Sequence, residues 1–352
     1  MLGSFHFDDY SIFADPALAS PLHTRPLTYL TFWLNYALGG REPLGYHLFN
    51  LALHVGVVLL LWEVLKRLIP PRAALIAALV FAIHPIQSEA VAYVFARAIL
   101  LAAVFSLLSA LAWLDGRRWL AVVWFALALL GKEEAAAFPL VLWMMERGKR
   151  RDALGPIAAM LTLALAAGLH VIWAAGAVAG SGAGAGSGIS ASAYLAAQGA
   201  AVVRYLRLVV LPWGLTVDPE IRASWLAWAV LAAAVAVAWK YRSQAGGSFL
   251  AALVLLAPSS SVFPAADLAV DRRMYLPMLA LAVTAGLLLA RLRTWWVAAV
   301  AVVLIALSIG RMEVWRTERS LWEEAARRAP AKVRPKIQLA RVVEPELSRR
   351  LL

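Results

Sequence analysis

Residues 51–62 read LALHVGVVLLLW, an almost unbroken apolar run in which hydrophobic and polar residues do not alternate. A strand of a membrane barrel would alternate between the two kinds of side chain, so this run predicts a helix. The whole chain is similar: 62% of its 352 residues are hydrophobic and 15% are charged, and the mean hydropathy is +0.74. Soluble domains are about half apolar and about a quarter charged. We therefore predict an all-α polytopic membrane protein, because the bilayer admits segments that satisfy their own backbone hydrogen bonds.

Ten segments are predicted to span or enter the membrane. They are residues 46–69, 72–84, 91–114, 117–131, 133–147, 153–178, 222–240, 246–262, 273–290 and 294–312. Several are shorter than the roughly 20 residues that a full crossing needs. Segment 72–84 is the clearest case, and we expect it to combine with the polar turn HPIQSEAV at residues 84–91.

Charged residues divide the helix ends into two sets. One set holds 13 basic and 4 acidic residues, a net charge of +9, and the other holds 10 basic and 11 acidic residues up to Arg311. The first set comprises Glu63, Lys66, Arg67, Arg72, Asp115, Arg117, Arg118, Glu146, Arg147, Lys149, Arg150, Arg151, Asp152, Lys240, Arg242, Arg291 and Arg293. Because basic loops remain in the cytoplasm, the first set is predicted to be cytoplasmic and the N-terminus to face outside.

This orientation requires residues 193–212 not to cross the membrane. The segment carries Arg204 and Arg207 among apolar residues at helical spacing, which predicts an interfacial or re-entrant amphipathic helix. If the segment crosses instead, every later segment is inverted. The positions of the basic residues at helix ends also make orientation a better explanation of the net charge of +12 than nucleic-acid binding.

Two further regions differ from the apolar bundle. Residues 179–190, AGSGAGAGSGIS, are typical of a flexible linker. Residues 315–352 are predicted to form a helical tail outside the membrane domain, which comprises residues 1–314 and has its first outer loop at 1–45. The chain has no cysteine, which excludes disulfides and thiol-bound metals, and it shows no signal-peptide pattern.

Polar residues that are not simple membrane anchors are concentrated at the predicted outer ends. FHFDDYSIF, residues 5–13, supplies Asp8 and Asp9, which we predict to be catalytic. Arg97 interrupts an apolar helix, which is costly in lipid, so it must face the bundle interior, a cavity or a partner. The predicted substrate-binding residues are Arg25, His84, Glu89, Arg97, Lys132, Glu133, Arg272 and Arg273. Acids combined with several arginines suit transfer from a phosphorylated donor, in which arginine stabilises the departing phosphate and a carboxylate takes a proton.

Each of these residues also has a purely structural interpretation. The two acids and the Lys132–Glu133 pair could be solvated loop, His84 could cap a helix end, Arg97 could pair with Glu89, and Arg272 and Arg273 could extend to the membrane interface. His47 and His54, seven residues apart, fit packed polar residues better than metal ligands. No spacing predicts a zinc site, and the sequence identifies no cofactor, although His84 with Glu89 leaves a divalent metal open.

Six motifs occur in order along the chain. They are FHFDDYSIFADP (5–16), TRPLTYLTFWLNYALGGREPLGYHLFNLALH (24–54), FAIHPIQSEAVAYVFARAILLAAVFSLLSALAWL (81–114), LALLGKEEAAAFPLVL (127–142), LPWGLTVDPE (211–220) and DRRMYLPM (271–278). This set resembles the transmembrane and tetratricopeptide repeat-containing proteins, which are protein O-mannosyltransferases with a GT-C fold. The resemblance is specific in the first third of the chain and looser afterwards.

The resemblance implies a GT-C-like bundle of about ten transmembrane helices with amphipathic outer-loop helices and a short helical tail. It also implies a polyprenyl-phosphate mannose donor and inverting transfer to a hydroxyl, expected to be Ser or Thr of a protein, with a glycan or lipid acceptor left open. Asp8 or Asp9 would be the base, Arg97 would contact the donor phosphate, and the other predicted residues would line the cleft. A bacterial cytoplasmic membrane with a periplasmic site is expected.

The sequence departs from the family in two places. The family has a transmembrane helix before its FDD motif, whereas four residues precede Phe5 here, and it continues into a repeat array of which residues 315–352 resemble only a fraction. Two other classes of function stay open. A flippase of lipid-linked sugars would need charges near the bilayer midplane and internal repeats, and neither is visible. A non-catalytic scaffold would make Asp8 and Asp9 dispensable.

Overall fold

The fold, a computed structural model, is described for residues 4–14, 25–146, 148–177, 188–242, 245–260, 264–265 and 267–343. Its regular elements there are helices, with no β-strand in these ranges, so the all-α prediction is confirmed. They are η1 (Phe7–Tyr10), α1 (Ser11–Ala14), α2 (Pro26–Gly39), α3 (Pro43–Lys66), α4 (Pro71–Ile83), η3 (Pro85–Gln87), α5 (Ser88–Ala92), η4 (Val94–Ala96), α6 (Arg97–Leu114), α7 (Arg118–Gly131), η5 (Glu133–Ala137), α8 (Phe138–Met145), α9 (Arg150–Ala177), α10 (Ala191–Val210), α11 (Trp225–Lys240), α12 (Ala245–Leu256), η7 (Asp271–Met274), α13 (Tyr275–Leu289), α14 (Thr294–Val314), α15 (Glu318–Arg328) and α16 (Val333–Val342).

Six helical segments of the described chain are long and apolar enough to cross a membrane. Four are α3, α9, α10 and α14, and the other two are α6 with η4 and α13 with η7. A seventh arises if α4 and the following Pro85–Ala92 count as one span, bent by 49°. The apolar helices α7, α11 and α12 are shorter. The polytopic prediction is therefore confirmed, whereas the union of residues 72–84 with the turn that follows stays a prediction.

The bend after α4 has a local cause. His84 precedes Pro85, and the proline ring disfavours helical backbone in the residue before it. His84 accordingly adopts an extended conformation, with φ −72° and ψ 127°, and ends α4. Its Nδ1 accepts a hydrogen bond from the Ile86 backbone N–H at 3.2 Å, which caps the new turn. The interpretation of His84 as a helix-end cap is thus confirmed, and the turn directs Glu89 into the protein, where it is 1% exposed.

Most of the helices pack around a main apolar core, and a glycine allows a close approach of two of them. The core draws buried residues from α3, α4, α6, α7, α12 and α13. Gly286 on α13 lies against α4, where an added Cβ would stand 2.7 Å from the Ala77 Cβ, closer than real carbon atoms pack. This contact draws the start of α13, which follows Arg272 and Arg273 of η7, next to the end of α4.

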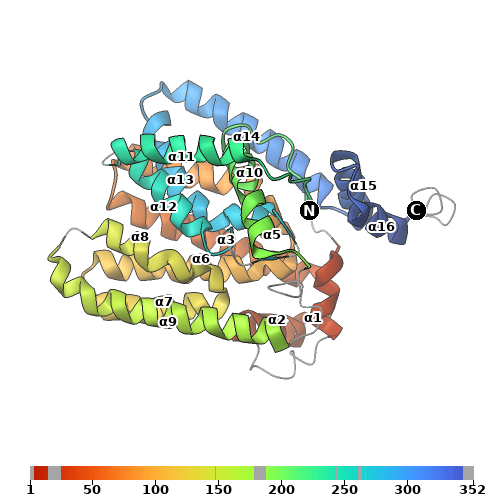
Figure 1. The fold of residues 1–352 in the computed structure, drawn as a ribbon, viewed down its shortest axis with the longest axis horizontal. Helices are drawn as coiled ribbons and strands as arrows, with labels where there is room; N and C mark the ends of the chain where they lie inside the picture. The colour runs from red at the N-terminus through yellow and green to blue at the C-terminus, as the bar shows by residue number, and fades with distance from the viewer. Residues whose placement is uncertain are drawn as a thin grey trace.

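The two sets of charged helix ends lie at opposite ends of the bundle. Three contacts join members of the basic set: Arg67 with Asp115 at 2.5 Å, Arg118 with Glu146 at 3.0 Å, and Arg72 Nη2 with the Leu292 carbonyl at 2.8 Å. The N-terminal helix α1, α5, α15 and α16 gather at the other end, on the right in Figure 1. The grouping follows the sequence prediction, whereas the side of the membrane that each end faces stays a prediction.

Helix α10 is the segment on which the predicted orientation depends. Its 20 residues are apolar enough to cross a membrane. It nevertheless runs across the direction of α6, α7 and α9 in Figure 1. Its Tyr194, Gln198 and Tyr205 side chains are buried and hydrogen-bond to the carbonyls of Ser259, Leu268 and Val270, respectively. This packing favours the interfacial interpretation, which stays a prediction.

The tail forms a helical hairpin of α15 and α16 that packs on the bundle. Trp315, Leu321 and Trp322 form a cluster with Tyr93 and Ala96 of the α5–α6 connection. The predicted division at residue 315 stays a prediction. Residues 344–352, like most of the predicted linker 179–190, lie outside the described residues.

Candidate functional site

The N-terminal acids lie beside the break between α5 and α6. Asp9 is fully buried; its Oδ1 accepts from the Phe95 backbone N–H at 2.7 Å and its Oδ2 from the His6 backbone N–H at 3.0 Å. The His6 Nε2 lies 2.8 Å from the Trp315 carbonyl and must donate, because a carbonyl only accepts. Burial lowers the pKa of His6 to about 4, so its ring is neutral. Asp8 belongs to η1, and its side chain lies outside the described part of the structure.

Arg97 begins α6 and is completely buried. Its Nε donates to Asn50 Oδ1 at 2.8 Å, its Nη1 to the Thr31 carbonyl at 3.1 Å, and its Nη2 to the Tyr46 carbonyl at 3.1 Å. Aromatic rings surround the guanidinium, with the centroids of Phe32 and Phe49 at 4.6 and 4.5 Å from its carbon. Cations are attracted to such ring faces.

These contacts bear on two interpretations of Arg97. The pairing with Glu89 is wrong, because Glu89 pairs with Arg272 instead, and Arg97 is satisfied by α2 and α3. The prediction that Arg97 contacts a donor phosphate stays untested. In this structure the guanidinium joins α2 and α3 to the start of α6.

The first half of a polar network lies where α2 meets the turn after α7. Arg25 and Glu133 form a two-point contact, with Nε–Oε2 at 3.0 Å and Nη2–Oε1 at 2.6 Å. Thr28 Oγ1 donates to the Gly131 carbonyl at 3.0 Å beside it. Burial acts to raise the pKa of Glu133, but the Arg25 charge and hydrogen bond outweigh it and lower that pKa to about 2. Arg25 therefore fastens the start of α2 to the GKEE turn.

Lys132 continues this half toward the centre of the network. It is 7% exposed, and its Nζ lies 2.9 Å from Glu134 Oε1. Burial lowers the pKa of Lys132. The negative charge of Glu134 acts to raise that pKa, while the positive charges of Arg25 and Arg272 act to lower it further. Three cations therefore share this space, each with a carboxylate partner: Arg25 with Glu133, Lys132 with Glu134, and Arg272 with Glu89. The interpretation of Lys132 as part of a solvated turn is wrong, because the side chain is buried.

The second half of the network is formed by η7, the loop before it, and α5. Arg272 Nη1 contacts Glu89 Oε1 at 2.5 Å, and the Arg272 backbone N–H donates to Glu89 Oε2 at 3.2 Å. Its Nη2 lies 3.7 Å from Asp267 Oδ2. Arg273 is buried and donates to the Tyr194 hydroxyl at 3.1 Å and to the Asp267 carbonyl at 2.9 Å. Neither arginine extends to an interface as a simple anchor.

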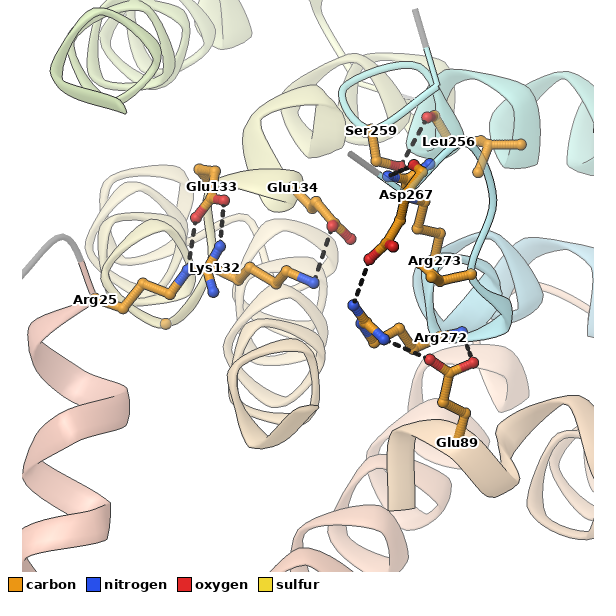
Figure 2. A network of polar contacts seen from close by, with 12 residues as sticks. Arg25, Glu89, Lys132, Glu133, Glu134, Leu256, Ser259, Asp267, Arg272 and Arg273 are labelled. Carbon is orange, nitrogen blue, oxygen red and sulfur yellow. Dashed lines mark hydrogen bonds and ion pairs between the residues drawn. The ribbon is translucent and has the colours of Figure 1, made fainter. Parts of the chain in front are cut away.

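Figure 2 shows the two halves facing each other, with the Lys132–Glu134 pair directed toward Asp267 and Arg272. A second link runs through the break before α6. The Arg272 guanidinium carbon lies 5.5 Å from the centroid of the Tyr93 ring, and the Asp9 carboxylate is bonded to the backbone of Phe95, two residues on. The structure thus brings Arg25, Glu89, Lys132, Glu133, Arg272 and Arg273 into one region, with Asp9 beside it.

His84, like Arg97, is a predicted site residue that lies apart from the network. Its Nε2 lies 3.1 Å from the Val209 carbonyl, while its Nδ1 accepts from Ile86, so both ring nitrogens have protein partners. In the described part of the chain, no three His, Asp or Glu side chains are grouped as a metal site would need. His54 is packed, with its Nδ1 2.7 Å from the Tyr275 hydroxyl.

The sequence interpretation did not select two residues that complete the network, Glu134 and Asp267. Asp267 lies between the site and the tail, where it pairs with Arg334 of α16 as well as Arg272. The signal available for Asp267 was an acid four residues before the DRRM motif in an apolar stretch. Nothing in the sequence pairs Asp267 with the tail, because that contact depends on how the hairpin docks.

Three comparisons with known proteins bear on this site. Residues 21–173 match the family model for dolichyl-phosphate-mannose-protein mannosyltransferases. Human protein O-mannosyl-transferase TMTC4 is 46% identical over 100 residues, which cover 24% of this chain and 14% of that protein. Mouse TMTC3 is 48% identical over 83 residues, covering 24% and 9%, and Drosophila melanogaster Tmtc1 is 41% identical over 125 residues, covering 34% and 15%. No solved structure matches the chain.

The predicted resemblance is therefore confirmed over part of the chain. The matched segments make up a small part of each relative, 9–15% of its length in these three. The family model covers α2 to α9, including Arg25, Glu89, Arg97, Lys132 and Glu133.

Proposed function

We propose that this chain is the membrane-embedded part of a glycosyltransferase. It would transfer mannose from a polyprenyl-phosphate donor to a hydroxyl, of Ser or Thr in a protein, with inversion at the anomeric carbon. The reaction would take place at the membrane face that carries the network of Figure 2, outside a bacterial inner membrane. Support comes from the family model over residues 21–173 and from the concentration of charged side chains at that end of the bundle.

One observation carries the proposal: cations from separate elements, the buried Lys132 and the half-buried Arg272, face each other across the network. Lys132 from the η5 turn and Arg272 from η7 each have a carboxylate partner, and Arg25 lies beside them. The Arg272 Nη2 makes only a long contact, 3.7 Å, to Asp267. A phosphate accepts several charge-assisted hydrogen bonds at once, so Arg272 and Lys132 are our candidates to hold the leaving polyprenyl phosphate.

The attacking hydroxyl needs a base on the opposite side of the sugar. Both oxygens of Asp9 already accept backbone hydrogen bonds, which suits a residue that fixes the N-terminal segment. We therefore favour Asp8 as the base and Asp9 as its support. The hydroxyl oxygen would bond to the anomeric carbon as the bond to the phosphate oxygen breaks, and Asp8 would receive the hydroxyl proton. Arg97 would hold α2 and α3 around this segment rather than bind phosphate.

The test uses the purified chain in nanodiscs with polyprenyl-phosphate mannose and Ser/Thr peptides, and it measures release of polyprenyl phosphate. We expect release to fall by about 10²–10⁴-fold in Asp8→Asn, the usual contribution of a general base. Asp152→Asn, at the opposite end of the bundle, is the matched control and should keep the wild-type rate. Release that survives Asp8→Asn combined with Asp9→Asn would refute the mechanism. Transport of the lipid without release would favour a flippase, and neither activity would favour a scaffold.

A further inference from the structure

The tail hairpin reaches the network through one carboxylate. Asp267 Oδ1 contacts Arg334 Nη1, near the start of α16, and Asp267 Oδ2 lies 3.7 Å from Arg272 Nη2. The two oxygens of one side chain are therefore divided between the tail and the network. The contact to Arg334 is the closer of the two.

The hairpin that carries Arg334 is fixed in place by separate contacts. Lys332 pairs with Asp218, and the Ala331 backbone N–H donates to Glu220 Oε1 at 2.8 Å. Trp315 and Trp322 pack into the cluster beside Tyr93. Arg334 is thus delivered to Asp267 by a docked hairpin rather than by a side chain that happens to lie nearby.

Asp267 is also fixed from the network side. Its backbone carbonyl accepts from Arg273 Nη2 at 2.9 Å, a contact that does not depend on the Asp267 side chain. Burial raises the pKa of Asp267, but the charges of Arg334 and then Arg272 outweigh this and lower it, so the side chain is an anion. If Arg334 were neutral, Arg272 would be the nearest cation left to this anion.

We propose that Arg334 is a positioning residue of the transfer site: by holding the carboxylate of Asp267, it leaves Arg272 available to the anionic phosphate of the lipid-linked donor. The inference rests on the proposed function, which assigns that phosphate to Arg272. The tail then contributes to donor binding without touching the donor. Removal of Arg334 lets Asp267 compete with the phosphate for Arg272, whereas removal of the Asp267 charge ends the competition.

The experiment is a double-mutant cycle on the full chain in nanodiscs, with the dissociation constant of polyprenyl phosphate measured by isothermal titration calorimetry. Arg334→Gln should weaken binding by roughly three- to fivefold, the scale of one partly exposed ion pair. Asp267→Asn should bind at least as tightly as the wild type, and adding Arg334→Gln to it should change nothing further. Arg341→Gln, on the same helix with a side chain that donates to Gln338, is the control and should bind like the wild type.

The outcomes separate this inference from the proposed function. Equal weakening by Arg334→Gln with and without Asp267→Asn would mean that Arg334 acts only through docking of the hairpin, and would overturn the inference while the proposed function stands. An Arg334→Gln variant that binds polyprenyl phosphate as tightly as the wild type would also overturn the inference and leave the proposed function standing. A wild-type chain that neither binds polyprenyl phosphate nor releases it would refute both. A drop in donor affinity without a drop in thermal stability distinguishes positioning from misfolding.

Discussion

Replacing Arg97 with lysine separates the two roles considered for this buried cation. The substitution keeps the positive charge but replaces a planar fork of donors with a single ammonium. The fork now serves three acceptors on two helices: Asn50 Oδ1 at 2.8 Å and the Thr31 and Tyr46 carbonyls at 3.1 Å each. Because these acceptors surround a flat group, one ammonium can reach about one of them.

The expected cost follows from the hydrogen bonds that lysine cannot make. A hydrogen bond to a charged group contributes about 1.5–3 kcal/mol, and two such bonds disappear. Thr31 and Tyr46 lie within helices, where their carbonyls can also accept backbone bonds, so the lower value applies and the sum is about 3 kcal/mol. With about 2.1 cal/mol/K of unfolding entropy per residue, 3 kcal/mol corresponds to a melting temperature lower by about 4 °C. Helices that persist after unfolding in detergent would reduce that entropy and increase the shift.

The assay combines thermal unfolding in detergent with the affinity for polyprenyl phosphate measured at a temperature where both proteins are folded. Arg97→Lys should lower the melting temperature and leave the affinity within about twofold of the wild type. Arg272→Lys is the matched comparison, because a lysine there can keep its ion pair with Glu89; it should lower the affinity and change the melting temperature little. An Arg97→Lys protein with unchanged stability and abolished affinity would refute our reasoning and restore Arg97 as the phosphate contact.

Three further predictions concern residues that support the site and the bundle, and each is checked by thermal or acid unfolding. The pKa of Glu133 is lowered to about 2 from an ordinary value of 4.5, so the ion pair with Arg25 stabilises the fold fully above pH 4.5. The wild type should therefore be more stable than Glu133→Gln at neutral pH, and this difference should shrink as the pH falls from 4.5 toward 2. A difference that does not change with pH would contradict the ion pair. His54→Phe and Tyr275→Phe should each cost about 1 kcal/mol, with the double variant costing less than the sum, and strict additivity would show that the 2.7 Å contact contributes nothing. Gly286→Ala should lower the stability by about 1–3 kcal/mol, because the added Cβ would collide with α4. Gly310→Ala is the control: a Cβ there meets no atom within 4 Å, so its stability should be close to that of the wild type. Equal stabilities of the two variants would contradict the close packing of α13 on α4.

The helices could be predicted from the sequence because their signal is local. A run such as residues 51–62 is too apolar for solvent and does not alternate, and α3 covers it. The break at His84 and Pro85 was predictable for the same reason, since proline restricts the residue before it. The positions of charges also predicted which helix ends lie together, because a charge in a membrane protein is tolerated near water or a partner.

The partners of those charges could not be predicted. Arg97 was expected to be buried because it interrupts an apolar helix, but its acceptors come from α2 and α3, far along the chain. The spacing of eight residues suggested Glu89 as its partner, and the bend between α5 and α6 places Glu89 against Arg272 instead. A pairing that depends on where a helix breaks is a tertiary property, and a single sequence does not contain it.

The pairing of these charges has a consequence for how a ligand could bind. A buried charge is costly without a partner, and the cations of the network have carboxylates of their own: Arg25 has Glu133, Lys132 has Glu134, and Arg272 has Glu89. An anion that enters must therefore exchange partners with these acids, and the weakest contact is where exchange costs least. That contact is the 3.7 Å approach of Arg272 to Asp267, whose other oxygen is held by the tail. Donor affinity in this chain should consequently depend on residues that never meet the donor, and it should respond to changes in the tail before it responds to changes in the two-point Arg25–Glu133 contact.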